Sequence, residues 1–253
     1  MKPLNKLSLM VLTLLTAGSV RAQLTFLSDS RSVSVSGWVQ DADGNVSQSY
    51  TQSQNPSASF ASFAGNVSGN ASGPYYNNTI YSGSSASQNS SLTSAQISYS
   101  ASVGAYQSYP APFGHLYSDA GSTFSVSFSV SSPIQFSLTD DQHNWNPADA
   151  GESLILSSST HGTIVTGPSL DPTGSGTDQY SGVLEPDQIY TLQISLTAQD
   201  YYSPNAYQGF DVLLNTPQLL PVPEPSSSLL LATGAVVTGL IALRRKRQAA
   251  AKS

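Results

Sequence analysis

The chain has 253 residues and no cysteine, so disulfide bonds and thiolate metal sites are excluded. Only 9% of the residues are charged, and the formal net charge is −6. Arg31 is the one Lys or Arg between positions 23 and 222, so this acidic part is excluded from binding nucleic acid through phosphates or docking on an anionic membrane.

Residues 1–22 have the three parts of a signal peptide. Two lysines precede an apolar run at 7–17, and Ala22 provides a small residue before Gln23. A permanent membrane anchor would need a longer apolar run. We therefore expect export of the chain and cleavage between Ala22 and Gln23, which leaves residues 23–216 as the exported domain.

The exported domain is predicted to be built from strands, because apolar and polar residues alternate along it and no stretch has helical spacing. The strongest alternation covers 124–130 and continues in the same parity over 134–138. Pro133 cannot donate a ladder hydrogen bond, so the segment forms two strands, or one strand bent where it passes between sheets. We expect a mainly β fold, an antiparallel β-sandwich with jelly-roll-like character. Further strands are expected at 33–38, 95–103, 190–198 and 210–214, with shorter candidates near 58–64, 78–82, 153–157, 162–166 and 180–184.

Residues 40–91 are expected to be loop-rich. Ser, Asn, Gln and Gly dominate this stretch, and its aromatic residues follow no fixed period. Long loops on a sheet and weak strands both fit this composition.

The segment 41–45 reads Asp-Ala-Asp-Gly-Asn and has two interpretations. Asp41, Asp43 and Asn45 place oxygen-bearing side chains at alternate positions, which suits calcium. The spacing of the glycine differs from that of the helix–loop–helix calcium site, and Asp-Gly is also typical of a hairpin turn. Both a simple turn and a calcium contact are therefore kept as alternatives.

A dense polar segment follows the strand expected at 134–138. Asp140, Asp141 and Trp145 could hold calcium, or a sugar stacked on the indole ring. With Glu152, the carboxylates could also form a glycosidase acid–base pair. The simpler alternative is a solvated loop.

The segment 183–190 is predicted to be a turn between two strands. Pro186 and Asp187 suit the central positions of such a turn, since proline presets its φ angle and aspartate bonds to nearby backbone. This prediction concerns the fold alone.

The C-terminus combines three features in a fixed order. Val222–Pro225 is Val-Pro-Glu-Pro, whose prolines favour the extended backbone that a protease or transpeptidase cleft accepts. The uncharged apolar run at 229–243 is predicted to form a single transmembrane helix, which the basic cluster after it holds on the cytoplasmic side. We therefore divide this end into a linker at 217–228, the helix, and a basic tail at 244–253.

This arrangement resembles the PEP-CTERM family of sorting signals. The resemblance implies recognition by an exosortase, a membrane transpeptidase-like enzyme of Gram-negative bacteria that make exopolysaccharide. It also implies transient anchoring in the inner membrane, cleavage near the motif, and transfer to the cell surface or extracellular matrix. The matching residues are Val222, Pro223, Glu224 and Pro225, the apolar run, and the membrane-stop residues Arg244, Arg245, Lys246 and Arg247.

Three functions from different classes remain open. The first is a non-enzymatic structural or adhesive component of a polysaccharide matrix or biofilm. The second is a carbohydrate-binding module that stacks sugars on Trp38, Trp145 or exposed tyrosines. The third is a hydrolase, but no nucleophile elbow or local metal-binding histidine pair is present. We expect no enzymatic activity and no cofactor other than possible calcium.

Overall fold

The computed structural model describes residues 23–108, 115–144, 150–167, 176–200 and 205–216. These residues form twelve β-strands and no helix, so no helix among them is long and apolar enough to cross a membrane. The expected signal peptide, sorting linker and transmembrane helix lie outside the described residues. The strands are β1 (Leu24–Gln40), β2 (Val46–Gln54), β3 (Phe63–Tyr75), β4 (Asn78–Thr93), β5 (Gln96–Gln107), β6 (Leu116–Val130), β7 (Ile134–Asn144), β8 (Ala150–Ser158), β9 (Gly162–Gly167), β10 (Gly176–Leu184), β11 (Tyr190–Asp200) and β12 (Asn205–Asn215).

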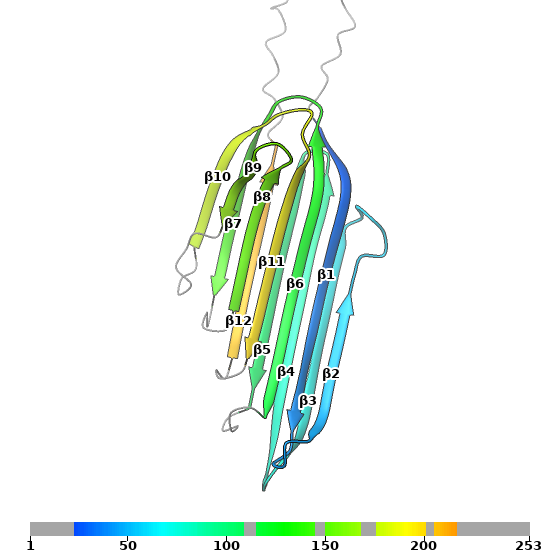
Figure 1. Ribbon diagram of the computed structural model, residues 1–253, viewed down its shortest axis with the longest axis vertical. Helices are drawn as coiled ribbons and strands as arrows, with labels where there is room; N and C mark the ends of the chain where they lie inside the picture. Colours follow the sequence, from blue (N-terminus) through cyan, green and yellow to red (C-terminus); the bar gives the residue numbers. More distant parts are fainter. Residues whose placement is uncertain (1–22, 109–114, 145–149, 168–175, 201–204, 217–253) are drawn as a thin grey trace, which may run out of the picture. The chain divides into compact units, whose positions relative to one another are not determined.

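The strands are arranged in two six-stranded antiparallel sheets (Figure 1). Sheet A has the order β2-β1-β6-β11-β8-β9, and sheet B has the order β10-β7-β12-β5-β4-β3. The prediction of a mainly β, antiparallel fold is therefore confirmed. A sandwich-like arrangement fits the packing, while jelly-roll connectivity stays a prediction.

The two sheets pack against each other through a main apolar core and a smaller second cluster, which consists of Val39, Ala71, Ile80 and Leu116. Strand β1 lies against β3 and β4, β6 lies against β4 and β5, and β11 lies against β5 and β12. Alternate residues of each strand point into this space, as Phe124, Val126 and Phe128 of β6 do. Sequestering these side chains from water supplies the main stabilising free energy, at about 25 cal/mol per Å² of apolar surface.

The strongest alternation in the sequence forms two strands in different sheets. The chain leaves sheet A at Val130 and enters sheet B at Ile134, with Pro133 between them. The apolar residues of both strands face the same interior, which explains why their parity is shared. The two-strand alternative is therefore the one that the structure adopts.

The expectation of a loop-rich stretch at 40–91 is wrong, and the structure adopts the alternative of strands, because β2, β3 and most of β4 cover it. Strand β3 does alternate, but its inner positions include small residues such as Gly65, Gly69 and Gly73. The ring of Tyr50 from β2 occupies the space that a side chain at Gly69 would need, at 2.1 Å from an added Cβ. The small residues thus let the facing sheet approach closely. Because they are not large apolar residues, the alternation of inward and outward positions along β3 is not visible in the sequence. The strand expected near 58–64 is also misplaced, since β3 begins at Phe63.

The turn expected at 183–190 is confirmed. Strand β10 ends at Leu184, Asp187 has a φ angle of 61°, and β11 begins at Tyr190. The buried hydroxyl of Tyr190 donates to the Glu185 carbonyl at 3.0 Å and accepts from the Glu185 N–H at 2.6 Å. The turn backbone is therefore fixed from inside the strand that follows it, in the manner of a tyrosine corner.

Candidate functional site

Asp41, Asp43 and Asn45 lie in the hairpin turn between β1 and β2. The Asp41 Oδ1 atom accepts from the N–H groups of Asp43 at 3.0 Å and Asn45 at 2.8 Å, and Oδ2 accepts from Asn45 Nδ2 at 3.4 Å. These bonds, led by the one from the Asn45 backbone, lower the pKa of Asp41. The carboxylate is thus used to close the turn, as the simpler interpretation expects, and calcium binding there stays a prediction.

Asp140 and Asp141 do not form a shared site, and the expectation of a loop around them is wrong. Strand β7 runs on through Asn144, so the two side chains point to opposite faces of sheet B. Asp140 is buried between the sheets, whereas Asp141 is only partly covered. Trp145 lies outside the described residues, so its predicted contact with a sugar or calcium stays a prediction.

Asp140 instead belongs to a group of polar side chains in the interior, which we call the inner polar cluster: Asp140 and Gln142 of β7, Glu152 of β8 and Gln208 of β12. Gln208 donates through its side-chain amide to Glu152, which joins the two sheets. Asp140 Oδ1 accepts from the Asp178 N–H at 3.0 Å, while its Oδ2 and both amide atoms of Gln142 have no hydrogen-bond partner. Asp140 and Glu152 are candidates that the sequence offers, whereas the pairing of Glu152 with Gln208 has no signal in the sequence.

Both carboxyl groups of the inner polar cluster titrate above their usual range. Burial raises the pKa of Glu152 to about 7, with a smaller contribution from the charge of Asp140. Burial also raises the pKa of Asp140 to about 6, and the nearby carboxylates of Asp178 and Asp141 add to this shift. Near neutral pH the cluster can therefore take up or release a proton.

Asp140 and Gln142 of the inner polar cluster are 0% exposed, so a substrate cannot reach them as the structure stands, whereas Glu152 is partly exposed. Among the described residues, no three or more His, Cys, Asp or Glu side chains are grouped so that they could hold a metal ion. The two carboxyl groups come from facing sheets, so their charge state affects how the sheets pack.

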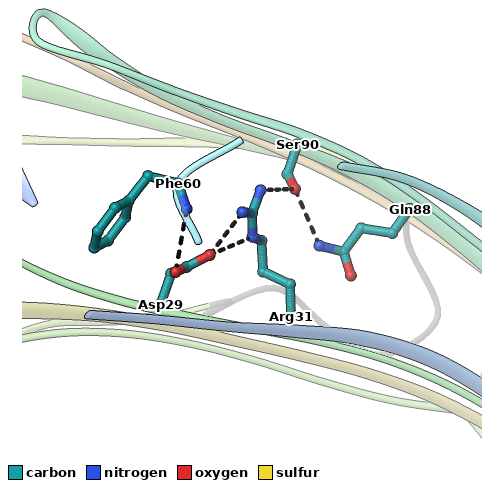
Figure 2. A network of polar contacts seen from close by, with 5 residues as sticks. All are labelled: Asp29, Arg31, Phe60, Gln88 and Ser90. Carbon is teal, nitrogen blue, oxygen red and sulfur yellow. Dashed lines mark hydrogen bonds and ion pairs between the residues drawn. The ribbon is translucent and has the colours of Figure 1, made fainter. Parts of the chain in front are cut away.

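A second polar network surrounds Arg31 of β1 (Figure 2). Its guanidinium donates twice to Asp29 Oδ2, from Nε at 2.9 Å and from Nη2 at 2.6 Å, and once to Ser90 Oγ at 3.4 Å. Ser90 Oγ is also hydrogen-bonded to the side-chain amide of Gln88, at 3.2 Å. The other oxygen of Asp29 accepts from the Phe60 N–H at 3.3 Å.

This network holds the segment between β2 and β3 against sheet A. Phe60 has a φ angle of 61°, which is uncommon for a bulky residue, and its ring stacks on Phe26 at 6.1 Å. An open polar cleft of about 450 Å³ lies beside the network, lined by residues 29–32 and 55–59. Arg31 and Asp29 are turned toward each other, so we assign the network a structural role in positioning this segment.

Aromatic side chains lie on the outer faces of both sheets, partly covered on sheet A and exposed on sheet B. Trp38 of β1 lies opposite Tyr117 of β6 on sheet A, with ring centroids 6.1 Å apart. On sheet B, Tyr81 of β4, Tyr106 of β5 and Tyr207 of β12 are 50%, 46% and 44% exposed. These tyrosines stand at outward-facing positions of their strands. Their exposure could have been predicted from the sequence if it were known which alternate residues of each strand face outward.

The C-terminal segment carries the clearest relation to known proteins. Residues 221–247 match the family model described as the PEP-CTERM protein-sorting motif. The predicted resemblance is thereby confirmed, and the motif indicates an exported protein that is sorted at the membrane by an exosortase. The sorting residues Val222–Pro225 and the stop residues Arg244–Arg247 fall inside the match but outside the described residues. At the other end of the chain, Ala22 also lies outside the described residues, while Gln23 is exposed just before β1.

The rest of the chain has little detectable similarity to known proteins. No curated protein matches. One solved structure, the GH31 alpha-xylosidase from Xanthomonas citri, is 11% identical over 78% of this chain and 20% of that chain, with a TM-score of 0.21. A similarity at this TM-score carries no inference about activity.

Proposed function

We propose that the chain is a non-enzymatic structural or adhesive component of the cell surface or extracellular matrix of a Gram-negative bacterium. The observation that carries this proposal is the sorting motif at residues 221–247, attached to a body that is mainly β. After export, an exosortase cleaves near the motif, and the β body is transferred to the surface. There it associates with exopolysaccharide or a biofilm.

The surface charge of the described residues supports this role. They contain no lysine, and their one arginine, Arg31, is only 2% exposed. The outer surface therefore carries carboxylates without a cationic side chain to offset them. Such a surface keeps the protein soluble and repels nucleic acid and anionic lipid headgroups. Both properties are compatible with a protein that acts outside the cell.

The arrangement of the carboxylates also favours a non-enzymatic role. A glycosidase needs two carboxyl groups that flank the scissile bond from an open cleft. Asp140 and Asp141 point to opposite faces of a strand, and Asp140 is closed off from solvent inside the molecule. A structural role makes no such demand on the geometry.

The sorting part of the proposal is tested by following the protein through cell fractions. Wild type is expected in the surface fraction, with mass spectrometry giving one end at Gln23 and another near Val222–Pro225. Glu224→Ala is expected to leave uncleaved chain in the inner membrane, since the extended acidic recognition segment is altered. A chain truncated after Leu220 lacks the predicted membrane span and is expected to lose surface retention.

The matched control is Glu185→Ala, which changes an exposed acidic residue in the turn before β11. It is expected to be sorted as wild type is. Stable full-length wild-type protein in the inner membrane would contradict the proposal, as would normal processing of the Glu224→Ala chain.

Carbohydrate binding is a second candidate function, and the exposed tyrosines of sheet B favour it. Stacking of a sugar ring on an aromatic ring requires an accessible ring face, which Tyr81, Tyr106 and Tyr207 offer at 44% exposure or more. Binding to polysaccharide would also give an adhesive role its physical basis.

A further inference from the structure

Three exposed tyrosines form a diagonal row on the outer face of sheet B, on the adjacent strands β12, β5 and β4. Tyr207 pairs with Gly104 of β5, and Tyr106 stands two residues further along that strand. Tyr106 in turn pairs with Gly83 of β4, and Tyr81 stands two residues beyond Gly83. Each step moves one strand sideways and two residues along, which separates neighbouring positions by about 8 Å.

The rings of this tyrosine row lie over glycines of the neighbouring strand. A Cβ added at Gly83 would meet Tyr106 Cζ at 2.2 Å, and one added at Gly104 would meet Tyr207 Cδ2 at 3.2 Å. Both glycines are buried although they are on the solvent side of the sheet. The rings therefore rest on the sheet and keep their other side open to solvent.

The surroundings of the tyrosine row are uncharged. Between Gly44 and Ser118 the sequence contains no Asp, Glu, Lys or Arg, so β3, β4 and β5 carry no formal charge. Hydroxyl groups line the neighbouring outer positions, where Ser87 Oγ and Ser102 Oγ are hydrogen-bonded at 2.7 Å. The exposed carboxylate on this face of β12, Asp211, stands four residues from Tyr207.

This combination favours one chemical class of ligand. The C–H groups on the flat side of a sugar ring carry partial positive charge and meet the electron-rich face of an aromatic ring. Flanking hydroxyl and amide groups can exchange hydrogen bonds with sugar hydroxyls. A chain that carries carboxylates or sulfates would be repelled by the anionic remainder of the surface.

We propose that Tyr81, Tyr106 and Tyr207 form a platform that binds a neutral polysaccharide chain along the diagonal of sheet B. This proposal names the class of ligand that the surface protein would bind. It rests on the proposed function only in assuming that the protein meets polysaccharide at the cell surface. Binding by the purified protein can be measured whether or not the tail is processed as proposed.

The test uses protein purified from whichever cell fraction contains it, and measures binding by affinity electrophoresis in gels that contain a polysaccharide. Mixed-linkage β-glucan and dextran are the neutral probes, and alginate is the anionic probe. Wild type is expected to be retarded by at least one neutral chain and not by alginate. The double variant Tyr81→Ser/Tyr207→Ser is expected to lose about tenfold or more in affinity, since two stacking contacts are removed.

A conservative variant within the row and a control variant outside it separate ring stacking from other effects. Tyr106→Phe keeps the ring over Gly83 and removes only the hydroxyl, so it tests whether the ring carries the contact; the affinity is expected to change by no more than about twofold. Tyr76→Asn removes the tyrosine that is most exposed among the described residues. It lies in the β3–β4 turn, outside the row, at a positive φ angle that asparagine tolerates. It is expected to leave retardation unchanged.

Three outcomes would overturn the platform. The first is that neither neutral polysaccharide retards the wild-type protein. The second is that the double variant is retarded as strongly as wild type. The third is that light scattering shows a wild-type dimer that the double variant does not form, which would mean that the tyrosine row is a dimer interface. None of these results bears on delivery to the surface, which the cell fractions test separately.

Discussion

Arg31 is the residue whose role changes most between sequence and structure. As the single cation of the acidic part, it could have been a surface contact for an anionic ligand. It is instead buried with Asp29, and the side chains of the pair are 0% and 2% exposed. A buried ion pair adds little over an apolar pair of equal size, but breaking it leaves one charge without a partner.

Replacing Arg31 with methionine is therefore expected to destabilise the fold strongly. The Asp29 carboxylate would remain buried without its cation, at a cost of about 3–5 kcal/mol in the free energy of unfolding. Urea unfolding followed by tryptophan fluorescence measures this change. The double variant Arg31→Met/Asp29→Asn is expected to recover part of the loss. A cost below about 1 kcal/mol for the single variant would mean that the pair behaves as a surface ion pair.

The raised pKa values of Asp140 and Glu152 predict a pH dependence of stability. A carboxyl group whose pKa is raised on folding binds more protons in the folded state, so its stabilising effect is complete at low pH and is lost as pH rises. The window runs from the ordinary pKa values of 3.8 and 4.5 to about 6 for Asp140 and about 7 for Glu152. Titration of these two groups is therefore expected to lower the melting temperature as the pH rises from 4 to 7.

Glu152→Gln should flatten that fall and raise the melting temperature at pH 8 by about 2–5 °C, because a neutral amide keeps the contact with Gln208 without a buried charge. Asp43→Asn, at an exposed position in the β1–β2 turn, is the control and should follow the wild-type curve. Parallel melting curves for wild type and Glu152→Gln across this range would refute the assignment.

At the scale of elements, the neighbouring edges of the two sheets protect each other. Strand β3 is an edge of sheet B, and β2 is an edge of sheet A. Gln54 Oε1 accepts from the Asn66 N–H at 3.0 Å, and Gln48 Oε1 accepts from the Ser72 N–H at 2.7 Å. Glutamine side chains of β2 thus occupy N–H groups that an edge strand would otherwise present to another chain.

Removing both glutamine side chains that cover the edge of β3, Gln48 and Gln54, is expected to promote self-association. In Gln48→Ala/Gln54→Ala, the N–H groups of Ser72 and Asn66 lose their partners, which lowers the free energy of unfolding by about 1–3 kcal/mol and opens the edge to a second copy. Size exclusion with light scattering measures the association. Gln52→Ala, on the same strand at an exposed position, is the matched control and should remain like wild type.

The sequence pattern of β3 and of most of β4 is obscured by one physical cause. Strands such as β6 and β11 place large apolar residues at alternate positions, so their period is visible. The inner face of β3 uses glycine and alanine beside Phe63 and Val67, and β4 places Ser82, Ser84, Gln88 and Ser90 on its buried face. Polar side chains at inner positions become acceptable only when the facing sheet supplies partners, as Ser122 and Tyr50 do for Gln88 and Ser84.

At the scale of the whole molecule, the two ends and the body have separate roles. The ends carry nearly all the positive charge. The C-terminal end holds the sorting motif, and the N-terminal end holds the predicted signal peptide. The described body has two sheets with apolar side chains packed between them, and an outer surface whose charge is purely acidic apart from histidine. Delivery of the protein and the chemistry of its surface therefore depend on different parts of the chain.

The sequence by itself determined the sorting signal, the mainly β fold and most strand positions. These depend on local features, namely a linear motif and a period of two, which need no knowledge of distant residues. Tertiary structure alone decided that Glu152 pairs with Gln208 and that Asp140 and Asp141 point to opposite faces of sheet B. It also decided that Arg31 is buried, and that three tyrosines line up across β12, β5 and β4. Each of these depends on strand register and on which sheet a strand joins, and both are fixed by contacts between residues far apart in the chain.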